Sequence, residues 1–267
     1  MPRQSPCKVI ARSLGGRMGR LDELVAVVTG AASGFGRGIA EAFASEGAKV
    51  VIADLDGERA EAAAAAIGGQ AIAVRGDVTK RTDVEGFIDA AVGQFGRLDI
   101  VVNNAGTTHT NKPALEVTEA EFDRIYAVNV KSIYLMTLAA VPAMEKQGGG
   151  VIINTASTAG IRPRPGLTWY NGSKGAVITL TKSLSAELAP KKIRVNAINP
   201  VIGETGMLES FMGRPDTPEN REKFVATIPL GRMSRPSDIA NAAVFLADPA
   251  SEFITGVALE VDGGRCV

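Results

Sequence analysis

The chain has 267 residues, 45% of them hydrophobic and 22% charged, and its 29 lysines and arginines balance its 29 acidic residues. This length and apolar content predict a globular protein with a buried core, and they exclude intrinsic disorder, collagen and disulfide scaffolds. The neutral balance argues against a nucleic-acid partner. The longest apolar run, Ile133 to Met144, is shorter than the ~18 residues of a membrane span and contains Pro142, so we expect no membrane partner.

The first 20 residues carry five lysines and arginines and no acid, which leaves residues 21–267 mildly acidic. They lack the apolar core of a secretory signal but share the Arg-rich, acid-free composition of mitochondrial transit peptides. We favour a flexible basic leader at 1–20, or an upstream start codon before Met18. Cys7 and Cys266 lie at opposite ends of the sequence and match no metal or redox spacing, so we expect free thiols, no metal and a cytoplasmic protein.

From residue 24, short apolar runs alternate with longer amphipathic stretches. The runs predict strands at Leu24 to Thr29, Lys49 to Ala53, Gln70 to Arg75, Ile100 to Val102, Val151 to Asn154, Ile193 to Ile198 and Val257 to Val261. The stretches predict helices at Gly36 to Ser45, Glu58 to Ile67, Thr82 to Phe95, Glu119 to Met144, Tyr170 to Leu188 and Ser237 to Leu246. The expected fold class is α/β, a single-domain, Rossmann-like, doubly wound parallel sheet of about seven strands with helices on both faces.

A glycine-rich turn, Thr29-Gly30-Ala31-Ala32-Ser33-Gly34-Phe35-Gly36, joins the first predicted strand to the first helix. Glycines let the backbone approach a phosphate closely, and the N–H groups that begin the helix can bind a pyrophosphate. The second strand is followed by Asp54, whose carboxylate can accept hydrogen bonds from both hydroxyls of an adenosine ribose. The plain alternatives are an ordinary turn and a helix cap at Asp54.

Tyr170 and Lys174 lie four residues apart on a predicted helix, so the ammonium can approach the phenol. Ser157 follows the fifth predicted strand, at the edge where open α/β sheets bind ligands. A surface pair and a turn serine are the plain alternatives. A free tyrosine has a pKa of about 10, so a base at neutral pH requires about 4 kcal/mol of phenolate stabilisation, which a cation at about 4 Å supplies at an effective dielectric near 20.

With these residues in place, nearly all of the chain after residue 21 resembles the classical short-chain dehydrogenase/reductase family. The family's Thr-Gly-x-x-x-Gly-x-Gly motif is met by Thr29 to Gly36, and its Asn-Asn-Ala-Gly motif by Asn103 to Gly106. Asp77-Val78 matches the pair that contacts adenine in the family. The catalytic residues that the resemblance implies are Asn129, Ser157, Tyr170 and Lys174.

The resemblance also implies a role for each of these residues. Tyr170 is the acid/base, Lys174 lowers its pKa and binds the nicotinamide ribose, Ser157 hydrogen-bonds the substrate oxygen, and Asn129 holds a water in a proton relay. The implied cofactor-binding residues are Gly30, Ser33, Gly34, Phe35, Gly36, Asp54, Leu55, Asp77, Val78, Asn104, Ala105, Gly106, Tyr170, Lys174, Pro200, Gly203 and Thr205. The implied assembly is a homotetramer that pairs through Tyr170 to Leu188 and the last strand.

The sequence departs from the family after the sixth strand. There the family usually has Pro-Gly followed by a threonine that holds the cofactor, whereas this segment reads Pro200-Val201-Ile202-Gly203-Glu204-Thr205, with Val201 at the glycine position. The segment begins a long irregular stretch, Pro200 to Pro229, that is rich in Gly and Pro. A stretch of this length favours a lid or binding loop over a plain connection.

The predicted cofactor is NAD rather than NADP. Members of the family that bind NADP usually carry a basic residue just before the second motif glycine or directly after the second strand, and these positions are Ser33 and Leu55 here. Arg37 and Arg59 are poorly placed to bind a phosphate. Asp54 would repel a 2′-phosphate, at a cost of about 2 kcal/mol at ~4 Å even in a water-like dielectric.

We therefore expect an NAD(H)-dependent oxidoreductase that interconverts a small-molecule secondary alcohol or polyol and its ketone by hydride transfer. A ketoreductase like 3-oxoacyl-[acyl-carrier-protein] reductase, using NADPH or NADH, shares every motif and is the alternative. A nucleotide-sensing protein without turnover is disfavoured because Tyr170 and Lys174 are both present. Outside these motifs, we expect His109 to be solvated and Trp169 to pack or to line a pocket.

Overall fold

The computed structural model describes residues 19–267, so most of the predicted leader, with Cys7, lies outside the described residues. The last two leader residues, Gly19 and Arg20, are described. The Arg20 guanidinium pairs with the Glu46 carboxylate at 2.6 Å, and the next residue, Leu21, is fully buried. Arg20 thus belongs to the folded part of the chain.

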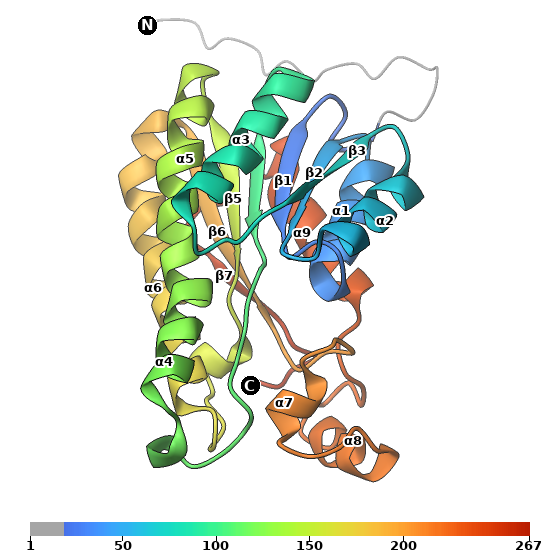
Figure 1. Ribbon diagram of the computed structural model, residues 1–267, viewed down its shortest axis with the longest axis vertical. Coiled ribbons are helices and arrows are strands. Elements are labelled where there is room, and N and C mark those ends of the chain that lie inside the picture. The colour runs from blue at the N-terminus through green and yellow to red at the C-terminus, as the bar shows by residue number, and fades with distance from the viewer. Residues whose placement is uncertain (1–18) are drawn as a thin grey trace, which may run out of the picture.

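Within residues 19–267 the chain forms one sheet of seven parallel strands in the order β3-β2-β1-β4-β5-β6-β7, which confirms the predicted fold class (Figure 1). Alternate side chains of each central strand enter the cores on opposite faces; Ala26 and Val28 of β1 face one way and Val25 and Val27 the other. This burial on both faces explains the continuous apolar runs. The strands are β1 Val25–Thr29, β2 Lys49–Asp54, β3 Ala71–Arg75, β4 Ile100–Asn103, β5 Gly150–Thr155, β6 Ile193–Pro200 and β7 Ala258–Val261.

Helices cover both faces of the sheet (Figure 1). Buried side chains of α1, α2 and α9 form the core on one face, and those of α3 and α5, with the end of α6, form the core on the other. The helices are α1 Gly34–Ser45, α2 Gly57–Ile67, α3 Arg81–Phe95, α4 Glu119–Tyr126, α5 Ser132–Lys146, α6 Thr168–Leu188, α7 Leu208–Met212, α8 Pro218–Val225 and α9 Pro236–Ala247.

The strand order reverses between β1 and β4. From β1 the chain adds β2 and β3 on one side, and then crosses to β4 and continues to β7 on the other. The connections that leave the carboxyl ends of β1 and β4 therefore separate in opposite directions and leave a crevice between them. This crevice is where a ligand is expected to bind.

Two predicted elements differ from the structure. The helix predicted from Glu119 to Met144 is divided into α4 and α5 by a π-helical turn, Ala127–Lys131, which contains Asn129. The stretch from Pro200 to Pro229 is not irregular throughout, because it contains α7 and α8. These helices have 5 and 8 residues, too few for a helical period to stand out in the sequence.

By length and composition alone, the helical run Glu119–Lys146 is able to cross a membrane. In this fold it is a core helix, because α5 buries Leu135, Met136 and Met144 with the side chains of β1 and β4.

Candidate active site

A cavity of about 540 Å³ opens at the carboxyl ends of the strands. It begins at Asp54, the last residue of β2, and at Asp77, which follows β3. From there it extends past the glycine turn to Ser157 and Tyr170 beyond β5. The predicted site residues all line this cavity except Gly36 and Asn129. The fold therefore brings together motifs that are far apart in the sequence.

The glycine turn leaves the start of α1 open to a ligand. Ser33 precedes the helix without a side-chain hydrogen bond to it, and the first turn of α1 contains no acidic residue. The first N–H groups of a helix lack intrahelical partners and favour an anion. Gly36 acts differently, because a Cβ there would lie 2.2 Å from the Gly30 carbonyl oxygen. It permits close packing of the helix on the turn.

Asp54 is fixed at one end of the cavity. Its Oδ2 accepts a hydrogen bond from the Ala32 N–H at 2.9 Å, and its Oδ1 accepts one from the Asp56 N–H at 3.1 Å. The nearby Arg37 does not line the cavity and pairs with Glu41 at 2.7 Å. Arg75, which lies opposite Asp54 on β3, does not line the cavity either, so Asp54 is a carboxylate at this end of the lining with no arginine of the lining beside it.

Thr29 and Asn104 join the glycine turn to the segment after β4. The Thr29 hydroxyl oxygen accepts hydrogen bonds from the N–H groups of Asn104 and Ala105 at 3.0 and 3.1 Å. The Asn104 amide donates to the Thr29 carbonyl at 2.9 Å, and its oxygen accepts a 3.5 Å hydrogen bond from Thr155. These contacts connect the ends of β1, β4 and β5.

Asn129 lies next to the cavity rather than in its lining. Its amide group accepts from the Thr107 N–H at 2.8 Å and donates to the Thr107 carbonyl and the Ser173 hydroxyl at 2.9 and 3.0 Å. A Cβ at Gly106 would lie 3.5 Å from Asn129 Oδ1 and 3.6 Å from Lys174 Nζ. Both polar groups therefore approach the same glycine, and the structure gives Asn129 a role in holding the loop after β4.

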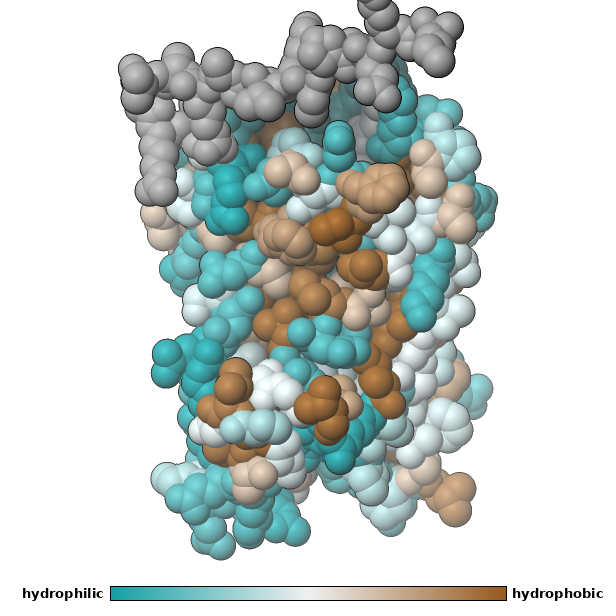
Figure 2. All heavy atoms as spheres, turned by 180° about the vertical axis from the view of Figure 1, so that it is seen from behind, coloured by the Kyte–Doolittle hydropathy of each residue, from teal (hydrophilic) through white to brown (hydrophobic). Residues whose placement is uncertain are grey.

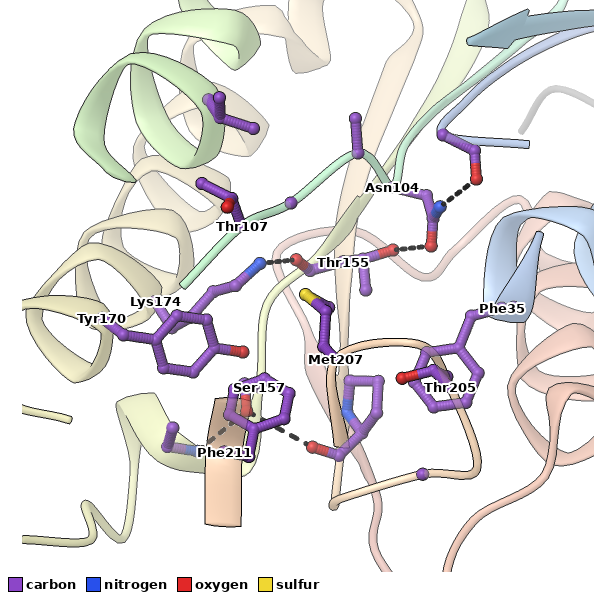
Figure 3. Close-up of a pocket in the computed structure, with 18 of the residues that line it drawn as sticks. Phe35, Asn104, Thr107, Thr155, Ser157, Tyr170, Lys174, Thr205, Met207 and Phe211 are labelled. Atoms are coloured by element: carbon purple, nitrogen blue, oxygen red, sulfur yellow. Dashed lines mark hydrogen bonds between the residues drawn. The ribbon is translucent and has the colours of Figure 1, made fainter. Parts of the chain in front are cut away.

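Tyr170, Lys174 and Ser157 meet at the other end of the cavity (Figure 3). Lys174 Nζ lies 5.8 Å from the centre of the Tyr170 ring and donates a 2.7 Å hydrogen bond to the Thr155 carbonyl. The Ser157 hydroxyl accepts from the Ala159 N–H at 3.1 Å. The helical spacing thus places phenol and ammonium together, as the sequence predicts.

The pKa of Tyr170 differs from the sequence-based expectation. Burial raises it to about 12, while the Ser157 hydroxyl acts weakly in the opposite direction. Burial also lowers the pKa of Lys174 to about 8. The expectation combined Lys174, about 4 Å from the phenolate, with the positive ring of a bound oxidised nicotinamide cofactor. In the structure the ammonium instead binds a carbonyl, and desolvation of the phenolate dominates.

The segment after β6 accommodates its departure from the family motif. Val201, at the usual glycine position, is buried. Gly203 supplies the close approach instead, because a Cβ there would lie 2.3 Å from the Phe35 ring. Thr205 lies beside Phe35 at the cavity (Figure 3).

Sequence reasoning missed the wall beyond Tyr170. Phe211 of α7 approaches the Tyr170 ring edge-on, with centroids 5.1 Å apart, and the rest of the wall comes mainly from the segment before α6 and from α7 and α8. The Gly- and Pro-rich stretch was the only signal of this wall. Its other members include Arg124, Arg162, Arg164, Leu167, Met207 and Phe224.

Two lone residues also have defined positions. His109 was expected to be solvated, but it is buried and its Nδ1 lies 2.8 Å from the Thr110 carbonyl oxygen. A single residue in a polar loop gives no periodic signal of burial, which explains the error. Trp169 packs edge-on against Phe122 and donates a 3.2 Å hydrogen bond to the Ala114 carbonyl, so it packs rather than lines the cavity.

Residues 30–265 match a family model described as enoyl-(acyl carrier protein) reductase. The 4-formylbenzenesulfonate dehydrogenase of Comamonas testosteroni is 55% identical over 92% of this chain and 98% of its own length. The 7alpha-hydroxysteroid dehydrogenase of Escherichia coli K12 is 39% identical over 92% of this chain and 95% of its own. The crystal structure of a 3-ketoacyl-(acyl-carrier-protein) reductase from Brucella melitensis, complexed with NADH, superposes with a TM-score of 0.88 at 50% identity and covers 92% of this chain and 100% of that one.

The buried Lys174 predicts a pH dependence of stability. Its pKa falls from 10.5 in the unfolded chain to about 8 in the folded one, so the unfolded chain holds more protons between these values. Stability therefore rises with pH across this window. Relative to Lys174→Met, the cofactor-free wild type should gain roughly 3 kcal/mol of unfolding free energy between pH 8 and 10.5, measured by urea denaturation. A constant difference between the two proteins would contradict the buried cation.

Proposed function

We propose that this chain, which belongs to the short-chain dehydrogenase/reductase family, is an NAD(H)-dependent dehydrogenase that interconverts a secondary alcohol and its ketone. The relatives described above are oxidoreductases that act on alcohol- or ketone-like substrates. One observation carries the proposal. A single cavity joins the Asp54 carboxylate and the open start of α1 to the Tyr170 phenol and the Ser157 hydroxyl. A dinucleotide and a small carbonyl compound therefore fit end to end.

The lining suits a nicotinamide dinucleotide. Asp54 offers a carboxylate for the ribose hydroxyls, the open N–H groups of α1 suit the pyrophosphate, and Lys174 lies at the nicotinamide end. A bound nicotinamide would supply the hydride acceptor for the alcohol carbon. In the proposal, the protein carries out the remaining chemistry, which is a proton transfer at the substrate oxygen.

Tyr170 is the group that exchanges this proton in our proposal. Its phenol lines the cavity beside Ser157, whose hydroxyl makes only a long, 3.5 Å hydrogen bond to the Pro200 carbonyl that a substrate oxygen would replace in the proposal. A pKa of about 12 keeps the phenol protonated, so it suits the acid role in ketone reduction directly. For alcohol oxidation, positive charge near the phenol must lower this pKa, and Lys174 is the protein's cation at that place.

A second candidate, reduction of a 3-oxoacyl thioester, is supported by the similarity to the Brucella reductase. The substrate panel must therefore include both classes. The Comamonas relative is named for an aromatic aldehyde, so benzylic alcohols and ketones belong in it as well.

Turnover tests the proposed function. Wild type should oxidise secondary alcohols of the panel with NAD+, and Tyr170→Phe should lower kcat by roughly 10²- to 10⁴-fold, the usual contribution of general acid–base catalysis. NADH fluorescence should show that the variant still binds cofactor. Tyr126→Phe, which changes a tyrosine of α4 outside the cavity lining, is the matched control. Turnover of 3-oxoacyl thioesters alone would favour the second candidate.

The position of Asp54 predicts the cofactor preference. The Asp54 carboxylate is held by two backbone N–H groups, and Leu55 is exposed beside it. The 2′-phosphate of NADP would replace a ribose hydroxyl that donates to this carboxylate and would bring a like charge close to it. NADP should therefore be disfavoured by at least about thirtyfold in kcat/KM. Asp54→Ala with Leu55→Arg should reduce or reverse this preference. Equal kcat/KM for both cofactors in wild type would refute the role of Asp54.

We propose that the protein assembles as a homotetramer. The strand β7 is an edge strand, and Phe253 and Val257 before it are exposed, as are Tyr134 and Leu138 on α5. Figure 2 shows a band of hydrophobic side chains along one face of the molecule. On α6, which is also expected at the interface, Val177 is buried within the chain, whereas Ile178, Leu180 and Leu184 are partly exposed.

Light scattering at micromolar concentration should give the mass of four chains, because exposed apolar surface of this kind favours association. A stable monomer would contradict the tetramer.

A further inference from the structure

The cavity lining beyond Tyr170 contains three arginines and no side-chain carboxylate, and from this we infer that the substrate is an anion: an alcohol or ketone with an apolar body and a carboxylate or sulfonate that binds Arg164. The inference rests on the proposed function and specifies its substrate class.

The charges of the cavity lining are separated by the fold. The lining beyond Tyr170 includes Arg124, Arg162 and Arg164. The two carboxylates of the lining, Asp54 and Asp77, lie instead at the carboxyl ends of β2 and β3, at one edge of the sheet. Within residues 19–267, none of the three arginines forms an ion pair with a side-chain carboxylate. The substrate end is therefore electropositive even though the whole chain has a net charge of zero.

Arg164 is the arginine best placed to bind an anion. Its guanidinium lies 4.8 Å from the centre of the Phe224 ring and donates one hydrogen bond, 2.8 Å long, to the Thr227 hydroxyl. The Asn171 amide donates a 2.9 Å hydrogen bond to its backbone carbonyl and holds the loop before α6 in place. A guanidinium has five N–H donors arranged as a planar fork, so several remain for a carboxylate or sulfonate.

The surroundings of Arg164 favour an anion still further. The side chain is half-buried, and burial together with the positive charges of Arg265 and Arg162 lowers its pKa. Arg162 itself donates hydrogen bonds to the Arg265 carbonyl and to a backbone oxygen of Val267, so these contacts hold its side chain. A partly desolvated cation among like charges gains more from an anionic partner than an exposed one does.

An apolar wall connects the reacting end to the charged end. Phe211 touches the Tyr170 ring, Phe224 stacks against Arg164, and Leu167 and Met207 belong to the same lining. A flat or short aliphatic body fits against these side chains with its carbinol at Tyr170. The same molecule then presents its anionic group to Arg164.

Binding of matched ligands tests the charge requirement without turnover. Calorimetry on the NAD+-loaded protein, which has no hydride to give a ketone, should show that 4-acetylbenzoate binds about 30-fold more tightly than 4-acetylbenzamide, as expected for a charge-assisted pair of hydrogen bonds. The sulfonate and its sulfonamide should differ in the same direction. An aliphatic pair, 5-oxohexanoate and 5-oxohexanamide, extends the test to a second body shape.

Three variants assign the effect to Arg164. Arg164→Gln should abolish the preference for the anion, and Arg164→Lys, which keeps the charge, should retain part of it. Arg214→Gln removes an exposed arginine from the segment between α7 and α8, outside the cavity lining, and should leave the preference unchanged. Equal binding of acid and amide by wild type, a preference that survives Arg164→Gln, or no binding of any anion would each overturn the inference.

Turnover separates this inference from the proposed function. Oxidation of 4-(1-hydroxyethyl)benzoate and its amide with equal kcat/KM would overturn the anion site and leave the dehydrogenase intact. Anion binding that depends on Arg164, without oxidation of any alcohol or reduction of any ketone, would support the site and refute the dehydrogenase.

Discussion

The hydrogen bonds that Thr29 makes across the crevice hold the whole site together. They connect the end of β1 to the segment after β4, and Asn104 extends them to Thr155 at the end of β5. Lys174 binds the Thr155 carbonyl, which fixes α6 to the same edge of the sheet. Because these groups are buried or partly buried, each unmade bond would cost about 1–3 kcal/mol. The edge is therefore rigid where a cofactor would lie.

The Tyr170 end of the cavity is built at the expense of stability. Lys174 is almost completely buried and has a carbonyl as its partner rather than a carboxylate, and Tyr170 is buried beside it. A core of apolar side chains would be more stable, and strained or desolvated groups of this kind are typical of active sites. The parallel sheet and its two hydrophobic cores supply the stability that offsets this cost.

The sheet order separates two kinds of electrostatic environment. The β2–β3 side of the cavity carries carboxylates, and the opposite side carries arginines from α4 and from the loop before α6. The glycine turn and the start of α1 lie between them. A dinucleotide that offers ribose hydroxyls to one side leaves the other side for a different ligand. In our proposals, the first side therefore selects the cofactor and the second selects the substrate.

The sequence by itself determined the sheet, the glycine turn and the pairing of Tyr170 with Lys174, because a strand period, a turn and an i, i+4 spacing are local properties of the chain. Only the tertiary structure decided the burial of His109, the π-helical turn at Asn129 and the raised pKa of Tyr170, since burial depends on what packs around a residue. The contact of Arg164 with Phe224 was likewise decided only by the tertiary structure. These residues are distant in sequence, and only folding brings them together.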